Sequence, residues 1–193
     1  MAFDPVPDPG YRTVPPPRSG GQLLLVPLLA GSLVAVTLGV YASLHEPTGL
    51  AVNLAGFSGP LAAKSWLATG AAVLALVQLA SSLVLYGRLP VAPPAGAAAV
   101  HRWSGRIAFL LAVPVAVHCL YAVGFQVGSP RALVHSLLGC LFFGAFVVKM
   151  LGLRRAGLPG WVLPVFGGVV FTALVGLWFS SSLWFFTTFG VRF

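Results

Sequence analysis

The stretch HCLYAVGFQVGSPRALVH carries a histidine at each end, His118 and His135, and lies between two long apolar runs. An ionisable side chain at membrane depth is costly and marks a functional site by default. Two imidazoles at matching depth could share one ligand, and haem iron is commonly held by axial histidines. The spacing therefore predicts that His118 and His135 are the axial, metal-binding ligands of one haem b.

The two histidines are predicted to lie at similar depth. His118 is seven residues before Phe125, the predicted end of its apolar run, which places it about 10 Å from that end at ~1.5 Å per residue. His135 is four residues after Arg131, a depth of about 6 Å by the same rise. Both imidazoles should therefore lie in the same half of the membrane, on neighbouring antiparallel helices.

Residues one turn away from these histidines could shape a cofactor cavity. Gly139, one turn deeper than the second histidine, would let a porphyrin ring pack close to the backbone. Pro114, one turn before the first, removes a backbone hydrogen bond and could open space by a kink. Arg131 could pair with a haem propionate, and Tyr121 and Ser129 are weaker candidates for that role.

Other interpretations of the histidine pair stay open. The two imidazoles could hydrogen-bond to each other or to carbonyls and so lock two helices together. They could also belong to a proton or ion path, although no Asp or Glu occurs in the apolar runs. A zinc ion would need more nitrogen, sulfur or carboxylate ligands, and the apolar runs offer none at this level except thiols.

The remaining histidines suggest interfacial roles. His101 begins an apolar run in the stretch HRWSGR, where lipid headgroups are the expected neighbours. A second haem on His101, with Met150 opposite, is conceivable but disfavoured because no second histidine lies at that level. His45 and Glu46 follow the first apolar run and are expected to be a cap or surface residues, with proton relay above the haem as the alternative.

The composition places these residues in a membrane protein. The chain of 193 residues is 58% hydrophobic and only 7% charged, with mean hydropathy +0.96, whereas soluble domains carry about 25% charged residues. Five runs are long enough to cross a bilayer, at Gln22–Leu44, Lys64–Tyr86, Arg102–Phe125, Ala132–Leu151 and Trp161–Phe186. We therefore expect an all-α, integral membrane five-helix bundle over residues 22–187. It would follow a disordered Pro-rich tail at 1–21 and end in a short segment at 188–193.

The arginines and lysines predict an orientation. We name the side of the N-terminal tail side A and the opposite side B. Eight basic residues fall on side A, and three fall on side B, namely Lys64, Arg131 and Arg192. Because loops rich in Lys and Arg stay in the cytoplasm, we expect a multi-pass cell-membrane protein with a cytoplasmic N-terminus and an external C-terminus.

The small residues of the last apolar run predict a packing face, and the two cysteines are expected to be unpaired. Gly168, Thr172 and Gly176 recur at four-residue steps in the last run, a pattern that lets helix backbones approach closely. This face could pack within the bundle or against a partner. Cys119 and Cys140 lie in apolar runs without a C-x-x-C motif, so a disulfide is not expected.

The stretches HRWSGR, HCLY and RALVHSLLGC resemble a family of small bacterial five-helix membrane proteins to which no activity is attached. More distantly, the paired helix histidines resemble the transmembrane cytochrome b superfamily, which includes ferric reductases. That resemblance implies haem b held between helices and single-electron transfer, with axial ligands at His118 and His135 only. Its members usually hold two haems on four histidines, a set that this chain lacks.

These patterns together predict an electron carrier. It would be a cytochrome b-like subunit or partner of a redox or respiratory assembly, holding one bis-histidine haem near the outer face, and a haem-dependent membrane oxidoreductase component is possible. The expected partners are the lipid bilayer and a redox subunit or quinol, with an oligomer or a larger complex as a further option. No nucleic acid is expected, because no basic stripe with interleaved aromatics occurs. The alternatives are a cofactor-free accessory subunit that docks through the glycine-rich last helix, and a small transporter or channel.

Overall fold

The computed structural model describes residues 20–51, 53–54 and 56–193. Most of the predicted tail, residues 1–21, lies outside this range. Its last two residues, Gly20 and Gly21, already belong to the first helix, which therefore begins slightly earlier than the hydropathy predicts.

The described residues form helices and no strands, which confirms the all-α prediction. The elements are α1 (Gly20–Leu44), α2 (Pro60–Leu85), α3 (Ala97–His118), η1 (Cys119–Val123), α4 (Pro130–Gly152), α5 (Val162–Trp178), η2 (Phe179–Leu183) and α6 (Trp184–Phe189). The elements η1 and η2 are single π-helical turns that continue α3 and α5 without a break.

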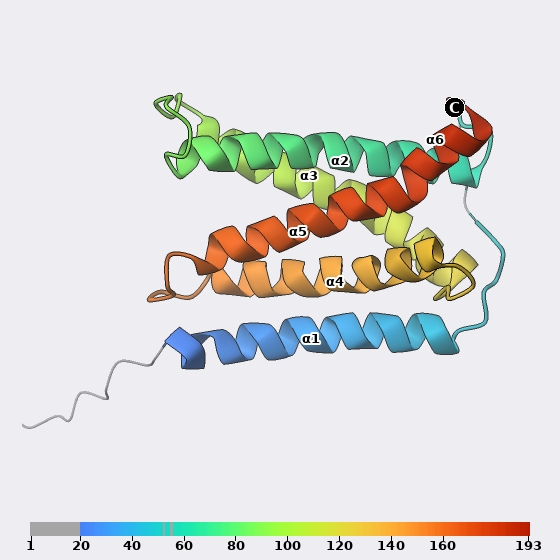
Figure 1. The fold of residues 1–193 in the computed structure, drawn as a ribbon, viewed down its shortest axis with the longest axis horizontal. Helices are drawn as coiled ribbons and strands as arrows, with labels where there is room; N and C mark the ends of the chain where they lie inside the picture. Colours follow the sequence, from blue (N-terminus) through green and yellow to red (C-terminus); the bar gives the residue numbers. More distant parts are fainter. Residues whose placement is uncertain (1–19, 52, 55) are drawn as a thin grey trace, which may run out of the picture.

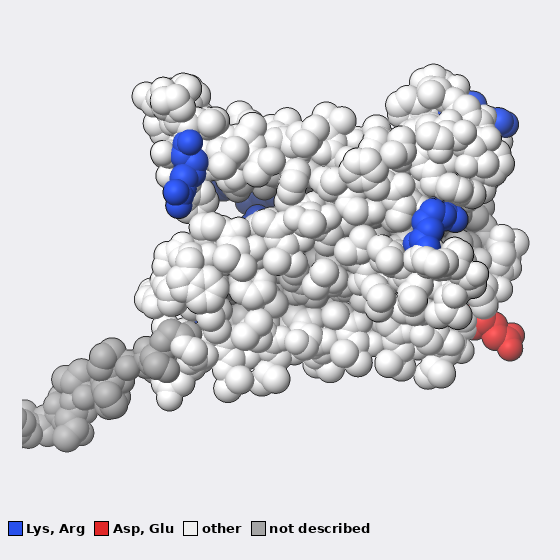
Figure 2. Space-filling model, in the orientation of Figure 1, with Lys and Arg blue, Asp and Glu red and all other residues white. Residues whose placement is uncertain are grey.

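Five helices in the described part of the chain are long and apolar enough to cross a membrane. Figure 2 shows the Lys and Arg side chains at the two ends of the bundle, with a belt of uncharged residues between them. Large apolar side chains are exposed around this belt, such as Leu33 at 67% and Leu110 at 66%. Such a surface is suited to lipid contact, because apolar patches of this extent are rare on soluble monomers.

The helices alternate in direction but do not all pack on their sequence neighbours. In Figure 1, α1 lies along α4, while α2 and α3 form the opposite side of the bundle and α5 crosses between the two pairs. The backbones of α3 and α4, predicted to be neighbours, run apart for much of their length. They meet through aromatic side chains, with Phe109 stacked on Phe146 at 4.1 Å between ring centroids.

Small residues determine how closely the helices approach. The core combines alanines of α2, α3 and α5 with Phe142 and Leu174. The tightest crossing joins α1 to α4, where a Cβ built on Gly31 would lie 2.5 Å from the carbonyl oxygen of Gly144. Glycine at both positions therefore brings the two backbones into direct contact, as small residues commonly do between membrane helices.

The helix that carries His135 has a well-defined start. Ser129 is its N-cap, and its hydroxyl accepts a hydrogen bond from Ala132 N at 3.2 Å, while Pro130 occupies the first helical position. This combination is favoured because it satisfies one free donor and adds a residue that has none. Ser129, a weaker candidate for propionate binding, thus has a structural role here.

The predicted small-residue face of α5 is divided between two environments. Gly176 packs within the bundle, since a Cβ there would lie 2.7 Å from Leu138 Cδ1 on α4. Gly168 has open space around its Cα, and Thr172 is exposed. The stripe is therefore a packing face within the bundle at Gly176 and an open surface nearer side A.

Candidate functional site

A cavity of about 370 Å³ lies in the side B half of the bundle. We call it the side B cavity. All five membrane-spanning helices contribute to its lining, and the predicted site residues His135, Arg131 and Gly139 are among them. Its volume is in the range of small-molecule sites in proteins, ~300–1,000 Å³. Gly139 has nothing within 4 Å of the position that a Cβ would take, so it leaves the space next to His135 open.

His135 is fixed in one tautomer by Ser180 of η2. The Ser180 hydroxyl is 2.9 Å from His135 Nδ1 and donates its own hydrogen to Gly176 O, at 2.7 Å. The hydroxyl must therefore accept the hydrogen bond from Nδ1–H, which leaves a lone pair on Nε2. Histidines that bind metals typically hold their second ring nitrogen in this way. His135 is thus a half-buried imidazole whose Nε2 lies on the cavity side, in contact with the Cys119 thiol.

The residue opposite Nε2 is Cys119, whose sulfur lies 3.9 Å from it. Ala116, Cys119, Leu120 and Val123 line the cavity at the i, i+3, i+4 and i+7 positions of α3 and η1. His118 falls outside this stripe and does not line the cavity. The structure therefore brings His135 and Cys119 together, while the pairing of His118 with His135 stays a prediction.

The packing of α3 on α2 explains where His118 lies. Gly105 lies against Gln78 and Leu111 against Gly70, and the same antiparallel register carries His118 to the first turns of α2. Lys64 is located there and also lines the side B cavity.

Two cations line the side B cavity. The Arg131 guanidinium donates a hydrogen bond to Ser180 O at 2.6 Å and stacks over the Trp184 ring, 4.1 Å from its centroid. Lys64 also lines the cavity, and within the described part of the chain it has no hydrogen-bond or ion-pair partner. A carboxylate-bearing ligand could therefore find two positive partners here.

Two predicted site residues lie away from the cavity. Pro114 is exposed on α3. The ring of Tyr121 packs edge-on against His45, with centroids 5.1 Å apart, and His45 stacks on Tyr41 at 5.2 Å. This aromatic cluster joins the end of α1 to η1, and Thr48 N donates to Tyr121 O at 3.0 Å. Tyr121 therefore anchors the connection between α1 and α2 in this structure.

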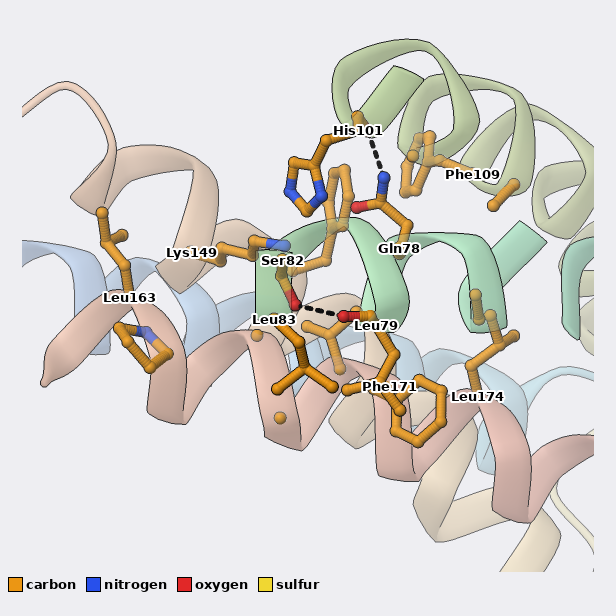
Figure 3. A pocket seen from close by; sticks show the side chains of 18 of the residues that line it. Gln78, Leu79, Ser82, Leu83, His101, Phe109, Lys149, Leu163, Phe171 and Leu174 are labelled. Carbon is orange, nitrogen blue, oxygen red and sulfur yellow. Dashed lines mark hydrogen bonds between the residues drawn. The ribbon is translucent and has the colours of Figure 1, made fainter. Parts of the chain in front are cut away.

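A second cavity, of about 520 Å³, lies in the side A half among α2, α3, α4 and α5. We call it the side A cavity. His101 lines it and repeats the arrangement of His135, because its Nδ1 lies 2.9 Å from Ser81 Oγ while that hydroxyl donates to Val77 O at 2.7 Å. Figure 3 shows the His101 ring and the Lys149 side chain extending toward the same space. Met150, which the sequence analysis places opposite His101 for a second haem, is 43% exposed and does not line this cavity.

The sequence analysis did not identify as site residues Lys64 and Cys119, which line the side B cavity, or Ser180, which contacts His135. Lys64 was visible as a single lysine at the start of an apolar run, and the run Ser180-Ser181-Ser182 interrupts another. Both cysteines are free, in agreement with the sequence. Within the described residues, no group of three or more His, Cys, Asp or Glu could hold a bare metal ion.

The sequence matches one protein family but no curated protein or solved structure. The resemblance to the transmembrane cytochrome b superfamily therefore gains no support from them and stays a prediction. Residues 24–193 match the family of unknown function DUF6529, and because the match covers most of the chain, the protein belongs to that family.

Proposed function

We propose that the protein is a membrane haem b protein that carries single electrons, with one haem in the side B cavity. The observation that carries this proposal is the His135 imidazole, held through Nδ1 by Ser180 with its Nε2 lone pair on the cavity side. Haem b would supply an iron that changes its oxidation state by one electron. A redox subunit or quinol would be the exchange partner.

The residues around the cavity fit such a group. His135 would provide one nitrogen ligand, and Ser180 would orient it. Lys64 and Arg131 provide two cations for the two propionates, and Gly139 leaves room for a flat ring beside its helix. The remaining lining is mostly apolar and would exclude water from the metal.

The second axial ligand is proposed to be His118, the residue that the sequence predicts. Cys119 is its rival, because its thiol already lies opposite Nε2. Cys119 Sγ lies 3.9 Å from His135 Nε2, whereas His118 does not line the cavity. His118 would therefore have to reach the haem from outside the present lining, and the two candidates are separated by the variants described below.

Visible absorption spectra of the purified protein test the proposal. The protein is produced with haem precursor, and oxidised and reduced spectra are compared for wild type and His135→Ala. We expect about one haem b per chain in wild type and loss of most of it in the variant. His45→Ala is the matched control, because His45 is also a side B histidine but does not line the cavity. Absence of a Soret band in wild type, or an unchanged spectrum in His135→Ala, would refute the proposal.

Two further variants identify the second ligand. His118→Ala should convert a six-coordinate, low-spin spectrum into a five-coordinate, high-spin one. Cys119→Ser should leave the low-spin spectrum unchanged. The opposite pattern would assign the second axial position to Cys119 and reject His118.

The charge bias supports an orientation for this electron carrier. Of the eleven Lys and Arg residues, eight fall on side A, and we propose that side A is cytoplasmic and that the haem lies near the external face. Alkylation of single cysteines introduced at Arg154 and Arg192 by an impermeant reagent on intact cells tests it. Labelling should occur at position 192 and not at position 154.

A further inference from the structure

The side A cavity has polar groups at one end and apolar walls beyond them. Lys149 is three residues before the end of α4, so it lies about 5 Å from the side A end of that helix. Phe142, seven residues earlier on the same helix, lines the cavity about 10 Å deeper. The cavity thus extends from the surface of the apolar belt toward the centre of the bundle.

The polar end carries unpaired positive charge. Lys149, Arg88 and Arg102 line the cavity there, and no carboxylate of the described chain lies on side A, since its single acidic residue, Glu46, is on side B. Lys149 has no hydrogen-bond or ion-pair partner among the described residues. Figure 2 shows blue side chains beside and inside a hollow at this end of the bundle. A partly buried ammonium without a counter-charge is costly and is stabilised by an anion.

Two neighbouring neutral groups, the amide nitrogen of Gln78 and Nδ1 of His101, already have partners within the protein. Gln78 Nε2 donates to Ser104 Oγ at 2.8 Å and to the carbonyl oxygen of His101. His101 Nδ1 is bound to Ser81. The cations are therefore the groups best placed to bind a polar ligand atom.

Space for a ligand exists next to the ammonium. Lys149 Nζ lies 3.9 Å from the position of a Cβ on Gly167, so position 167 of α5 places no side chain beside it. Gly168 has open space around its Cα and also lines the cavity. Deeper in the cavity the walls are aromatic and aliphatic, with Phe109, Phe171 and Leu174 among the residues labelled in Figure 3.

We propose that the side A cavity binds a single-chain anionic amphiphile. Its carboxylate or phosphate would contact Lys149, with Arg88 and Arg102 beside it, and its acyl chain would lie against the aromatic walls. The volume of about 520 Å³ is suited to a ligand of this size. The required chemistry is an anionic head joined to an apolar tail, which fits either a fatty acid or a lysophospholipid. This proposal does not depend on haem binding at side B.

Binding to the purified full-length protein in neutral detergent tests the proposal. The probes are oleate, oleoyl-lysophosphatidate, oleyl alcohol and inorganic phosphate, and binding is measured by native mass spectrometry together with the shift in Tm. We expect at least one of the two acids to bind, and to bind at least tenfold more tightly than oleyl alcohol or phosphate. The acid that binds more tightly distinguishes a carboxylate source from a phosphate source.

Lys149→Met removes the charge and keeps an apolar side chain of similar length. It should weaken binding of the acid at least tenfold, which corresponds to about 1.4 kcal/mol, while Lys149→Arg should retain binding. Arg154→Gln is the matched control, because it removes a charge from the same end without lining the cavity. Asp4 and Asp8 lie in the N-terminal segment, outside the described residues. Replacing both, by Asp4→Asn with Asp8→Asn, should also leave acid binding unchanged.

Several results would overturn the proposal. These are equal binding of oleyl alcohol and oleate, failure of both acids to bind, or unchanged acid binding in a folded Lys149→Met protein. If the methionine variant does not fold, an unchanged affinity in Arg88→Gln/Arg102→Gln serves the same purpose. A further contrary result would be two haems per chain, one of which is lost in His101→Ala but retained in the side B variants. This result would assign the side A cavity to haem and reject the amphiphile.

Discussion

Gly144→Ala should destabilise the bundle because it separates α1 from α4. A Cβ at position 144 would lie 2.7 Å from Gly31 O and 2.9 Å from Ala35 Cβ, whereas ordinary contact begins near 3.4 Å. The first shortfall, about 0.7 Å, is against a backbone oxygen that cannot rotate away. Overpacking of this kind costs ~1–3 kcal/mol, partly offset by a helix-propensity gain of up to ~1 kcal/mol on replacing glycine. Because the backbone oxygen cannot give way, we expect a cost near the upper end, and therefore a net loss of about 2 kcal/mol.

Unfolding in mixed micelles with increasing SDS, followed by tryptophan fluorescence, measures this loss. Gly39→Ala is the matched control on α1, because its Cβ would make an ordinary contact of 3.5 Å with Cys140 Sγ. The control should match wild type or be slightly more stable. If Gly144→Ala unfolds at the same SDS fraction as Gly39→Ala, the α1–α4 crossing is not as close as described.

Three other substitutions probe single interactions. Ser180→Ala removes the partner of His135 Nδ1 and should weaken haem retention about 10–100-fold in a haem-transfer assay; unchanged retention would exclude Ser180 as a positioning residue. Gln78→Leu removes the donor to Ser104 and should lower the free energy of unfolding by ~0.6 to ~1.7 kcal/mol, so equal SDS midpoints would contradict it. Trp66→Phe loses the indole donor to the residue 192 carbonyl, at 2.9 Å, and should speed carboxypeptidase digestion of the C-terminus, whereas an unchanged rate would show that the contact is not needed.

The number and placement of the helices could be predicted because their signals are local. Each membrane crossing requires about 20 apolar residues, and Pro60, Ser129 and Pro130 mark helix starts by their own backbone chemistry. Which helices pack together was not predictable in the same way. A helix that is apolar on every side gives no face for the core, so α3 and α4 were expected to be neighbours only because they follow each other in the chain.

Part of the candidate site could be predicted because its residues lie close together on one helix. His135, Arg131 and Gly139 share one face of α4, and helical periodicity alone places them together. The direction of His118 depends instead on the register of α3 against α2, and that of Tyr121 on the π-helical turn η1. Neither the register nor the extra residue of a π-turn has a signal in the spacing of apolar residues. Cys119, which follows His118 directly, faces the cavity as a consequence.

The two cavities have the same kinds of polar side chain, a lysine and a histidine held by a serine. Each contains a histidine whose Nδ1 is held by a serine that donates to the carbonyl four residues earlier. Each also contains a lysine without a partner among the described residues, Lys64 or Lys149. The charged groups without a partner at both ends are therefore cations, and from Pro47 onward the chain has no Asp or Glu to neutralise them. Ligands that bring carboxylates or phosphates into an apolar cavity satisfy this need, which is why anionic groups are proposed at both ends.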